Sequence, residues 1–283
     1  MPVCVFTGIA ASLYDGIPLN VLHLVLAFIG ALCAHIGVNV LNDYFDYKSG
    51  IDLKTMRTPF SGGSGILPAA SMKPRHVLLL GLSNLAIVLF IGIYFITVYK
   101  WAILPIGLAG ILIIYLYTPY LTKLSYVTEF VGPGLGFGLM VLGTYFTQSG
   151  TYSASALIVS LVAGLLIANL LLLNEFPDVE ADRSVGRKHL PIILGTGAAA
   201  MIYCVIAILA YIAIIAGVVA NILPPLALLG LLTVPLGVKA MKSALKNHNH
   251  IKSLLPALGT NVLVVLLTPL LMSIGVLVGY LVG

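Results

Sequence analysis

Long runs of apolar residues, separated by short polar segments, dominate the pattern along the chain. A helix needs about 20 mainly apolar residues to cross a bilayer. Because backbone groups in lipid find no water to bond, the crossing segments are expected to be helices, and the short alternating strands of a membrane barrel are not seen. The pattern predicts an all-α membrane protein in which residues 1–283 form a single polytopic domain. It predicts nine transmembrane helices, the first too short to cross alone, with approximate cores at 2–14, 18–43, 76–99, 101–118, 127–147, 154–174, 197–217, 221–240 and 255–281.

Composition agrees with this pattern. Hydrophobic residues make up 60% of the chain and charged residues 8%, and the mean hydropathy is +1.11, whereas a soluble domain is about half apolar and a quarter charged. The net charge of +5 does not indicate a nucleic-acid partner, because the basic residues fall in loops between spans. The three cysteines are scattered through apolar runs, which suggests neither a disulfide framework nor a metal site. The first residues lack the basic segment of a cleavable signal peptide, so none is expected.

The basic residues predict the orientation in the membrane. Of the 14 Lys and Arg residues, all but Lys100 fall on one side of a nine-span arrangement. Because cytoplasmic loops carry the excess of Lys and Arg, this side is expected to face the cytoplasm, with the N-terminus inside and the protein in the cell membrane. The residues on this side are Lys48, Lys54, Arg57, Lys73, Arg75, Lys123, Arg183, Arg187, Lys188, Lys239, Lys242, Lys246 and Lys252.

Acidic residues gather at two places on the same side. All but two of the nine Asp and Glu residues lie in the segments "NVLNDYFDYKSGID", residues 39–52, and "NEFPDVEAD", residues 174–182. These segments end helices four spans apart, so they share an orientation. The arrangement suggests a weak internal repeat of two parallel halves, roughly 1–118 and 119–240, plus a ninth helix. The two acidic ends are then expected to face each other across a central cavity open to the cytoplasmic side.

Spacing within each segment predicts which side chains share a face. In the first segment, asparagines and aspartates recur every three or four residues, so one polar stripe runs off the end of the helix. In the second segment, Asn174, Asp178 and Asp182 point one way if the helix continues past Pro177. They do not if that proline breaks the helix, and the sequence leaves both outcomes open.

Grouped carboxylates of this kind indicate a divalent cation. Like charges this close repel unless a cation offsets them, and oxygen ligands suit Mg²⁺ or Ca²⁺. Mg²⁺ commonly takes one or two carboxylates and completes its shell with water and substrate phosphate oxygens. The nearby Arg57, Lys123, Arg187 and Lys188 are suited to hold such phosphates. The combination predicts a substrate with a diphosphate head and an apolar tail. The alternative is a set of solvated loop acids balancing nearby basic residues, which two clusters at equivalent helix ends disfavour.

These motifs resemble those of the UbiA superfamily of intramembrane aromatic prenyltransferases. The family's first motif, Asn-Asp-x-x-Asp followed by a further Asp, reads here "NDYFDYKSGID", and its second, Asp-x-x-x-Asp, is Asp178 and Asp182. The commoner spacing places the last aspartate of the first motif four residues after the middle one, where this chain has Gly50, and Asp52 follows two residues later. This longer form, with "RTPFSGGSGIL" and "GRKHL", resembles the branch that prenylates 1,4-dihydroxy-2-naphthoate in menaquinone synthesis.

The resemblance implies a fold, a reaction and a set of site residues. It implies nine helices around a central cavity and Mg²⁺-dependent transfer of a prenyl group from an isoprenyl diphosphate to an aromatic acceptor in quinone biosynthesis, with two Mg²⁺ ions bridging aspartates and diphosphate. The implied catalytic and metal-binding residues are Asp46, Asp52, Asp178 and Asp182. The implied substrate-binding residues are Asn42, Asp43, Arg57, Tyr117, Tyr120, Lys123, Glu129, Asn174, Arg187 and Lys188.

Several alternatives stay open at this point. Glu129 either positions or deprotonates the acceptor, or is an acid favoured at a helix N-terminus by the helix dipole. The run "GPGLGFG" at 132–138 favours close helix packing over ligand binding. Within the superfamily, an ether-lipid prenyltransferase that acts on a glyceryl phosphate is an alternative function. A cation transporter is an alternative of another class, although transporter acids usually lie near the midplane rather than at basic helix ends. A phospho-alcohol transferase would carry an Asp-Gly-x-x-Ala-Arg signature, which is absent.

Overall fold

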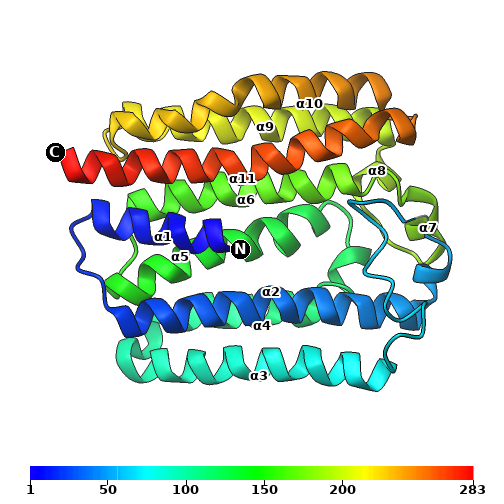
Figure 1. The fold of residues 1–283 in the computed structure, drawn as a ribbon, viewed down its shortest axis with the longest axis horizontal. Coiled ribbons are helices and arrows are strands. Elements are labelled where there is room, and N and C mark those ends of the chain that lie inside the picture. The colour runs from blue at the N-terminus through cyan, green and yellow to red at the C-terminus, as the bar shows by residue number, and fades with distance from the viewer. Residues whose placement is uncertain (56, 283) are drawn as a thin grey trace.

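The computed structural model describes residues 1–55 and 57–282, and these residues form helices and connecting loops without any strand (Figure 1). The α-helices are α1 (Pro2–Tyr14), α2 (Val21–Ser49), α3 (Pro74–Tyr99), α4 (Leu104–Leu116), α5 (Gly136–Ser149), α6 (Ala154–Asn174), α7 (Val179–Ser184), α8 (Leu190–Ile193), α9 (Thr196–Val219), α10 (Val234–Asn247) and α11 (Ile251–Val282). Shorter 3₁₀ turns are η1 (Ile51–Leu53), η2 (Lys100–Ile103), η3 (Leu121–Lys123) and η5 (Pro225–Thr233), and η4 (Phe130–Leu135) is π-helical.

The membrane-spanning segments follow the apolar runs of the sequence. Within the described residues, seven helical segments are long and apolar enough to cross a bilayer. One of them, Pro74–Leu116, consists of α3 and α4, and the chain reverses between them at η2 (Figure 1). The helix α1 has 13 residues, which at 1.5 Å per residue is too short for a hydrocarbon core of about 30 Å. The all-helical membrane fold is therefore confirmed, and the number of nine spans stays a prediction.

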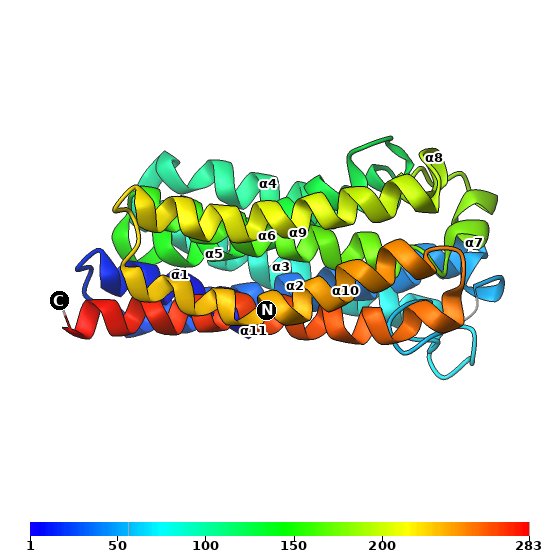
Figure 2. The ribbon, with the colours of Figure 1, turned by 90° about the horizontal axis from the view of Figure 1, so that it is seen from above.

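The first helix lies along the bundle without reaching both ends. Figures 1 and 2 both place the N-terminus about midway along the length of the molecule. The helix α1 packs on α5 and α11, and a Cβ atom added at Gly8 would lie 2.6 Å from the carbonyl oxygen of Val141. At the other end of α1, Tyr145 Oη and Ser155 Oγ each donate a hydrogen bond of 2.7 Å to Asp15. A close backbone contact and a polar anchor thus fix this short helix.

Packing is unequal across the bundle. A continuous core joins α1, α5, α6, α9, η5 and α11, and its side chains include Val141, Ala163, Ile214 and Met272, all at most 2% exposed. In the most apolar stretch of α6, 61% of the residues are buried inside the protein, whereas in the most apolar stretch of α2 only 17% are buried. The helices α2, α3 and α4 therefore form a thinner wall on one side of a densely packed remainder.

Close approach between η4 and α6 explains the glycine-rich run at 132–138. A Cβ atom at Gly164 of α6 would lie 2.8 Å from the carbonyl oxygen of Gly134, a distance that real Cβ atoms do not adopt without a shift. A Cβ atom at Gly138 would lie 3.3 Å from the carbonyl oxygen of Ser160. The close packing predicted for this run is confirmed at Gly134 and Gly138, whereas Gly132 and Gly136 of the same run line a cavity described below.

The two acidic segments end their helices differently. The helix α2 continues to Ser49, beyond its predicted core, and ends at Gly50, whose φ of 77° is the left-handed value common at helix C-termini. The helix α6 ends at Asn174, and α7 begins only at Val179. Pro177 lies in the break between them, so the continuous second helix that the spacing allowed is not formed. The second motif is therefore spread over a helix end, a turn and a short helix.

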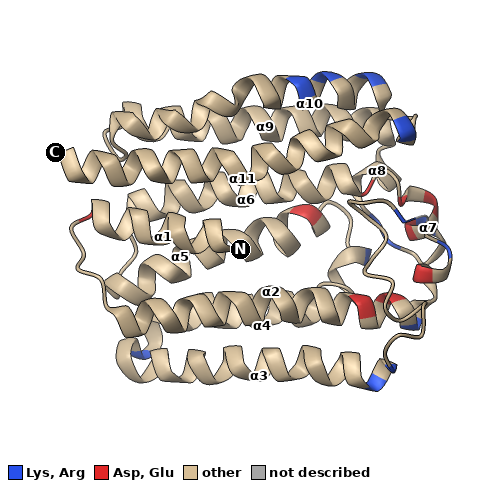
Figure 3. Ribbon diagram, viewed as in Figure 1, with Lys and Arg blue, Asp and Glu red and all other residues tan. Residues whose placement is uncertain are grey.

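Charged residues concentrate at one end of the bundle (Figure 3). Both acidic segments, α7 and the basic stretch of α10 lie at this end. At the opposite end, Asp15 follows α1 and Lys100 follows α3. The bundle thus has one strongly charged end and one nearly uncharged end.

Candidate active site

A polar cavity of about 470 Å³ opens between the charged ends of α2 and α6. The first acidic segment forms one wall, and the second, with residues that follow it, forms the other. The polar lining residues include Asn39, Asn42, Asp43, Asp46, Asp52, Asn174, Glu175, Asp178, Asp182, Arg187 and His189. The two acidic segments therefore face one space, as the sequence predicted.

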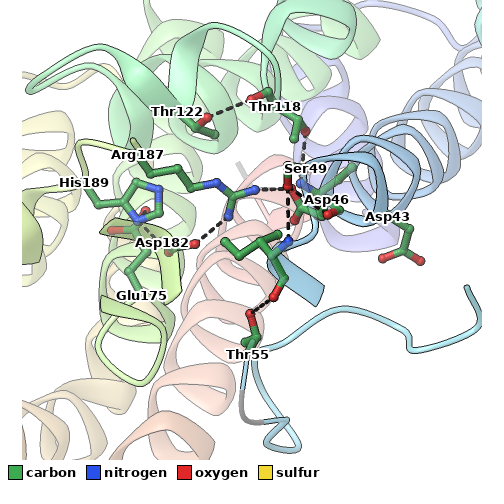
Figure 4. Close-up of polar contacts among 12 residues, drawn as sticks. Asp43, Asp46, Ser49, Thr55, Thr118, Thr122, Glu175, Asp182, Arg187 and His189 are labelled. Atoms are coloured by element: carbon green, nitrogen blue, oxygen red, sulfur yellow. Dashed lines mark hydrogen bonds and ion pairs between the residues drawn. The ribbon is translucent and has the colours of Figure 1, made fainter. Parts of the chain in front are cut away.

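Arg187 joins the two motifs directly (Figure 4). Its Nη1 donates a hydrogen bond of 2.8 Å to Asp182 Oδ1, and its Nη2 donates to Asp46 Oδ1. All three side chains are at most 12% exposed. Burial lowers the pKa of the guanidinium, but the carboxylates of Asp46 and Asp182 outweigh this and raise it. A fixed positive charge therefore lies between the two carboxylates.

The turn at 61–65 closes over the first motif. The backbone N–H of Ser64 donates a hydrogen bond of 3.3 Å to Asp43 Oδ1. A Cβ atom at Gly63 would lie 3.3 Å from Asp43 Oδ1 and 3.4 Å from Asp52 Oδ1, so both carboxylates point at this glycine. Gly63 also has a φ of 68°, in the left-handed region that glycine adopts readily. The turn thus leaves room for two carboxylates that converge from α2 and η1.

Two aspartates of the cavity hold their protons unusually tightly. Burial raises the pKa of Asp52 to about 6, assisted by the charge of Asp43 and opposed by Arg57. Burial also raises the pKa of Asp178 to about 7, assisted by the charge of Asp182. Carboxyl groups with such pKa values indicate a site short of positive charge.

The oxygen atoms of this cavity fit a hard divalent cation. Asp178 Oδ1 and Asn174 Oδ1 are buried without a hydrogen-bond partner. Among the described residues, no three His, Cys, Asp or Glu side chains are already gathered as a metal site. Oxygen ligands that are divided between the two motifs in this way suit Mg²⁺, because Mg²⁺ needs only one or two carboxylates and takes further oxygens from water and phosphate. The residues that would hold it are Asp46, Asp52, Asp178 and Asp182.

An apolar cavity of about 550 Å³ continues from the polar one. Its walls come from α2, α3, α4, η4 and α5, and near α6 the two cavities share the lining residues Asn39, Asn42, Tyr117, Leu171 and Asn174. Cβ atoms added at Gly92, Gly107 and Gly110 would meet nothing within 4 Å, so these glycines widen the apolar cavity. A polar head and an apolar tail of one substrate would each find a matching space.

The structure brings most of the predicted site residues together. Asn42, Asp43, Asp46, Asp52, Tyr117, Asn174, Asp178, Asp182 and Arg187 line the polar cavity. The side chains of Arg57, Tyr120, Lys123 and Lys188 are exposed and do not line either cavity. Glu129 is fully buried and lines neither cavity. The catalytic, metal-binding and substrate-binding roles of all fourteen residues stay predictions.

Three further residues belong to the site and were not predicted. His189 Nδ1 lies 3.1 Å from Asp182 Oδ2 and 3.5 Å from Glu175 Oε1. Thr118 Oγ1 accepts a hydrogen bond of 3.0 Å from Asn42 Nδ2. The sequence contained a weak signal for two of them, because Glu175 directly follows Asn174 and His189 comes two residues after Arg187.

An acid-lined cavity opens into an apolar cavity within a helical bundle. This arrangement is the one expected of a membrane-embedded enzyme that acts on a lipid-tailed substrate. A sequence model of the UbiA prenyltransferase family matches residues 1–261. The chain therefore belongs to the UbiA prenyltransferase family, and it is a membrane-embedded transferase of prenyl groups.

Curated relatives agree with this assignment. The chain is 29% identical over 255 residues to the 1,4-dihydroxy-2-naphthoate octaprenyltransferase of Bacillus subtilis, covering 88% of this chain and 79% of the relative. It is 27% identical over 229 residues to the digeranylgeranylglyceryl phosphate synthase of Pyrococcus furiosus, covering 74% of this chain and 72% of the relative.

Solved structures share the fold. A UbiA homologue from Aeropyrum pernix without ligand superimposes with a TM-score of 0.74 at 18% identity, covering 98% of this chain and 96% of that chain. A UbiA homologue from Archaeoglobus fulgidus, solved with GPP and Mg²⁺ bound, gives a TM-score of 0.62 at 15% identity, covering 98% of this chain and 95% of that chain. At these identities the likeness concerns the fold.

Proposed function

We propose that this chain transfers a prenyl group from an isoprenyl diphosphate to an aromatic acceptor of the dihydroxynaphthoate type, with release of diphosphate, in quinone biosynthesis. The observation that carries the proposal is the junction of the two cavities, where Asn39, Asn42, Tyr117, Leu171 and Asn174 line both. The names of the curated relatives in Bacillus subtilis and in Haemophilus influenzae, which both act on 1,4-dihydroxy-2-naphthoate, support this choice of acceptor.

Four carboxylates would bind the metal ions that the proposed reaction uses. Asp46, Asp52, Asp178 and Asp182 would hold Mg²⁺, and we propose two ions. Bound Mg²⁺ neutralises negative charge that develops on the departing diphosphate. The binding of Mg²⁺ by the GPP-bound homologue from Archaeoglobus fulgidus supports this assignment.

The residues of the chain would position the diphosphate and keep water away from the allylic carbocation. Arg187, held between the two motifs by Asp46 and Asp182, would donate its remaining N–H groups to the departing diphosphate. The C–O bond breaks with its electron pair on the diphosphate, and the acceptor ring forms the new C–C bond at the allylic carbon. For a dihydroxynaphthoate, the carboxyl group then leaves as CO₂. The apolar cavity around the tail would exclude water that otherwise reacts with the allylic carbocation.

The proposed orientation places the site at the cytoplasmic side. The charged end carries both motifs and the basic stretch of α10 (Figure 3). An excess of Lys and Arg is typical of cytoplasmic loops. We therefore propose that the polar cavity opens toward the cytoplasm and that the N-terminus lies inside.

A second function within the family has its own support. The relative from Pyrococcus furiosus synthesises digeranylgeranylglyceryl phosphate and is 27% identical, so an acceptor with a glyceryl phosphate in place of a ring is the alternative. Membership of a prenyltransferase family favours both enzymatic functions over a cation transporter.

A panel of acceptors tests the proposal. Purified protein in detergent is incubated with Mg²⁺, one prenyl diphosphate and either 1,4-dihydroxy-2-naphthoate, 4-hydroxybenzoate or a glyceryl phosphate, and products are identified by mass. We expect product with the naphthoate and loss of CO₂. Product with the glyceryl phosphate alone would replace the proposed acceptor.

Two matched variants connect the activity to the site. Asp178→Asn should abolish Mg²⁺-dependent transfer, because it removes a carboxylate that lines the polar cavity. Glu180→Gln should retain it, because the Glu180 side chain is 86% exposed and lies outside that cavity. Full activity of Asp178→Asn would reject the metal role of this residue.

A further inference from the structure

The connection between α4 and η4, residues 117–129, contacts the first motif and the residues that follow the second. On one side, Thr118 Oγ1 accepts the hydrogen bond from Asn42 of the first motif. On the other side, the connection binds residues 187–190, which follow the second motif. The backbone N–H of Lys188 donates a hydrogen bond of 2.9 Å to the carbonyl oxygen of Thr122. The N–H of Leu190 donates one of 2.7 Å to Glu129 Oε1.

Glu129 is an unusual member of this connection. Its side chain is 0% exposed, and among the described residues it forms no ion pair with a Lys, Arg or His. A buried carboxyl group without a cation is costly. Its Oε1 accepts a hydrogen bond from the Leu190 N–H, and the side chain lines neither cavity. Glu129 is thus placed to act on the protein backbone and not on the substrate.

A second buried acid accompanies Glu129. Both carboxyl oxygens of Glu175 lack a hydrogen-bond partner, and burial, followed by the charge of Glu129, raises the pKa of Glu175 well above its usual value.

Residues 187–190 transmit the contact to the site. Arg187 binds Asp46 and Asp182, and His189 lies 3.1 Å from Asp182 Oδ2. Leu190 is 2% exposed, so no water would replace a lost partner of its N–H. A shift of this N–H away from Glu129 would therefore move the segment that carries the charged groups of the second wall.

We propose that Glu129 is a positioning residue, whose side chain reaches the Leu190 N–H and thereby fixes residues 187–190 so that Arg187 and Asp182 face the diphosphate. The reach of the side chain, and not its charge, is what this role requires. The identity of the ligand as a diphosphate rests on the proposed function above.

Two conservative variants separate reach from charge. Glu129→Gln keeps the length and an acceptor oxygen but loses the charge, whereas Glu129→Asp keeps the charge and is one methylene shorter. Binding of inorganic diphosphate with Mg²⁺ is measured by calorimetry on the purified full chain in detergent. We expect Glu129→Gln to bind within about three-fold of the original protein. Glu129→Asp should bind about ten-fold more weakly, within the range that an unpaired buried N–H costs.

Thr128→Val provides the control for a general loss of packing. Thr128 Oγ1 donates a hydrogen bond of 3.1 Å to the carbonyl oxygen of Leu121, so this bond stays within the connection and involves none of residues 187–190. We expect this variant to lower the melting temperature and to retain diphosphate affinity. An equal loss of affinity in Thr128→Val and Glu129→Asp would overturn the positioning role.

Other outcomes also decide the matter. Unchanged affinity in Glu129→Asp would show that reach is unimportant, and a loss in Glu129→Gln as large as in Glu129→Asp would show that the charge is needed; either overturns the proposal. Failure of the original protein to prenylate any acceptor would reject the proposed function alone, because the binding comparison does not involve transfer.

Discussion

Arg187 is the residue on which the ligand-free arrangement of the site depends. It neutralises Asp46 and Asp182, both nearly buried, with one guanidinium. Removing one member of a buried ion pair leaves an uncompensated charge, which destabilises a protein by roughly 3–5 kcal/mol. The same two carboxylates are predicted ligands of Mg²⁺, so the guanidinium and the metal neutralise the same charges.

This overlap predicts the behaviour of Arg187→Met. Without Mg²⁺ the variant should be about 3 kcal/mol less stable, since two carboxylates lose their partner. Added Mg²⁺ should raise its melting temperature by more than that of the original protein. Thermal unfolding in detergent measures both. Arg183→Met is the matched control, because Arg183 is 55% exposed and pairs at 3.5 Å only with the exposed Glu180. Equal Mg²⁺ shifts in all three proteins would contradict the overlap.

The raised pKa values predict that Mg²⁺ affinity depends on pH. Asp178, with a pKa of about 7, is mostly protonated at pH 6 and mostly ionised at pH 8, and only the ionised form binds metal. Lowering the pH from 8 to 6 should therefore weaken Mg²⁺ binding about ten-fold, with a further loss from Asp52, whose pKa is about 6. Calorimetric titration with Mg²⁺ at several pH values measures this.

Asp178→Asn serves as the control for that titration. It removes a carboxyl group with a pKa of about 7, so the loss of Mg²⁺ affinity between pH 8 and pH 6 should become smaller than in the original protein. A dependence identical to that of the original protein would show that Asp178 is not a ligand.

At the scale of elements, the contact between η4 and α6 fixes the half-helix that begins next to Glu129. Gly164→Ala would place a Cβ atom 2.8 Å from the carbonyl oxygen of Gly134, and overpacking of this kind costs about 1–3 kcal/mol. The variant should melt at a lower temperature. Gly92→Ala, a helical glycine with nothing within 4 Å of the added atom, should be neutral or slightly stabilised. A lower melting temperature for Gly92→Ala than for Gly164→Ala would contradict the contact.

Elements were largely predictable from the sequence, because apolar runs long enough to cross a bilayer have few alternative conformations. The break after Asn174 was left open, since a proline either kinks or ends a helix depending on what packs around it. The motif residues were predictable because they recur at helical spacing. Which basic residues face the cavity was not, because Arg187 and Lys188 are neighbours just after the second motif and only Arg187 turns inward.

Residues that act through the backbone were the hardest to predict. The link from Glu129 to the Leu190 N–H spans 61 residues, and a backbone donor carries no signature in the sequence. Thr118 and His189 are single residues without a motif of their own. Their roles follow only from the turns that bring them beside Asn42 and Asp182.

At the scale of the whole molecule, the charge distribution predicts the orientation in the membrane. Lys100 and Lys246 are both exposed. Lys100 lies where α3 turns into α4 and Lys246 lies near the C-terminal end of α10, and these two places are at opposite ends of the bundle (Figure 1). In a background with Cys204→Ser, a cysteine at position 100 should react with an impermeant maleimide on intact cells. A cysteine at position 246 should react only after permeabilisation. The reverse pattern would place the site outside the cell.

The thin wall of α2, α3 and α4 and the dense remainder have an evolutionary consequence. The core around α6, α9 and α11 holds the fold together, whereas Gly92, Gly107 and Gly110 line the apolar cavity and Cβ atoms added there would meet nothing within 4 Å. Substitutions in the wall therefore alter the accommodated tail at little cost to folding. Lineages that carry this architecture are free to change the length of the isoprenoid they use, one glycine at a time, without passing through an unstable ancestor.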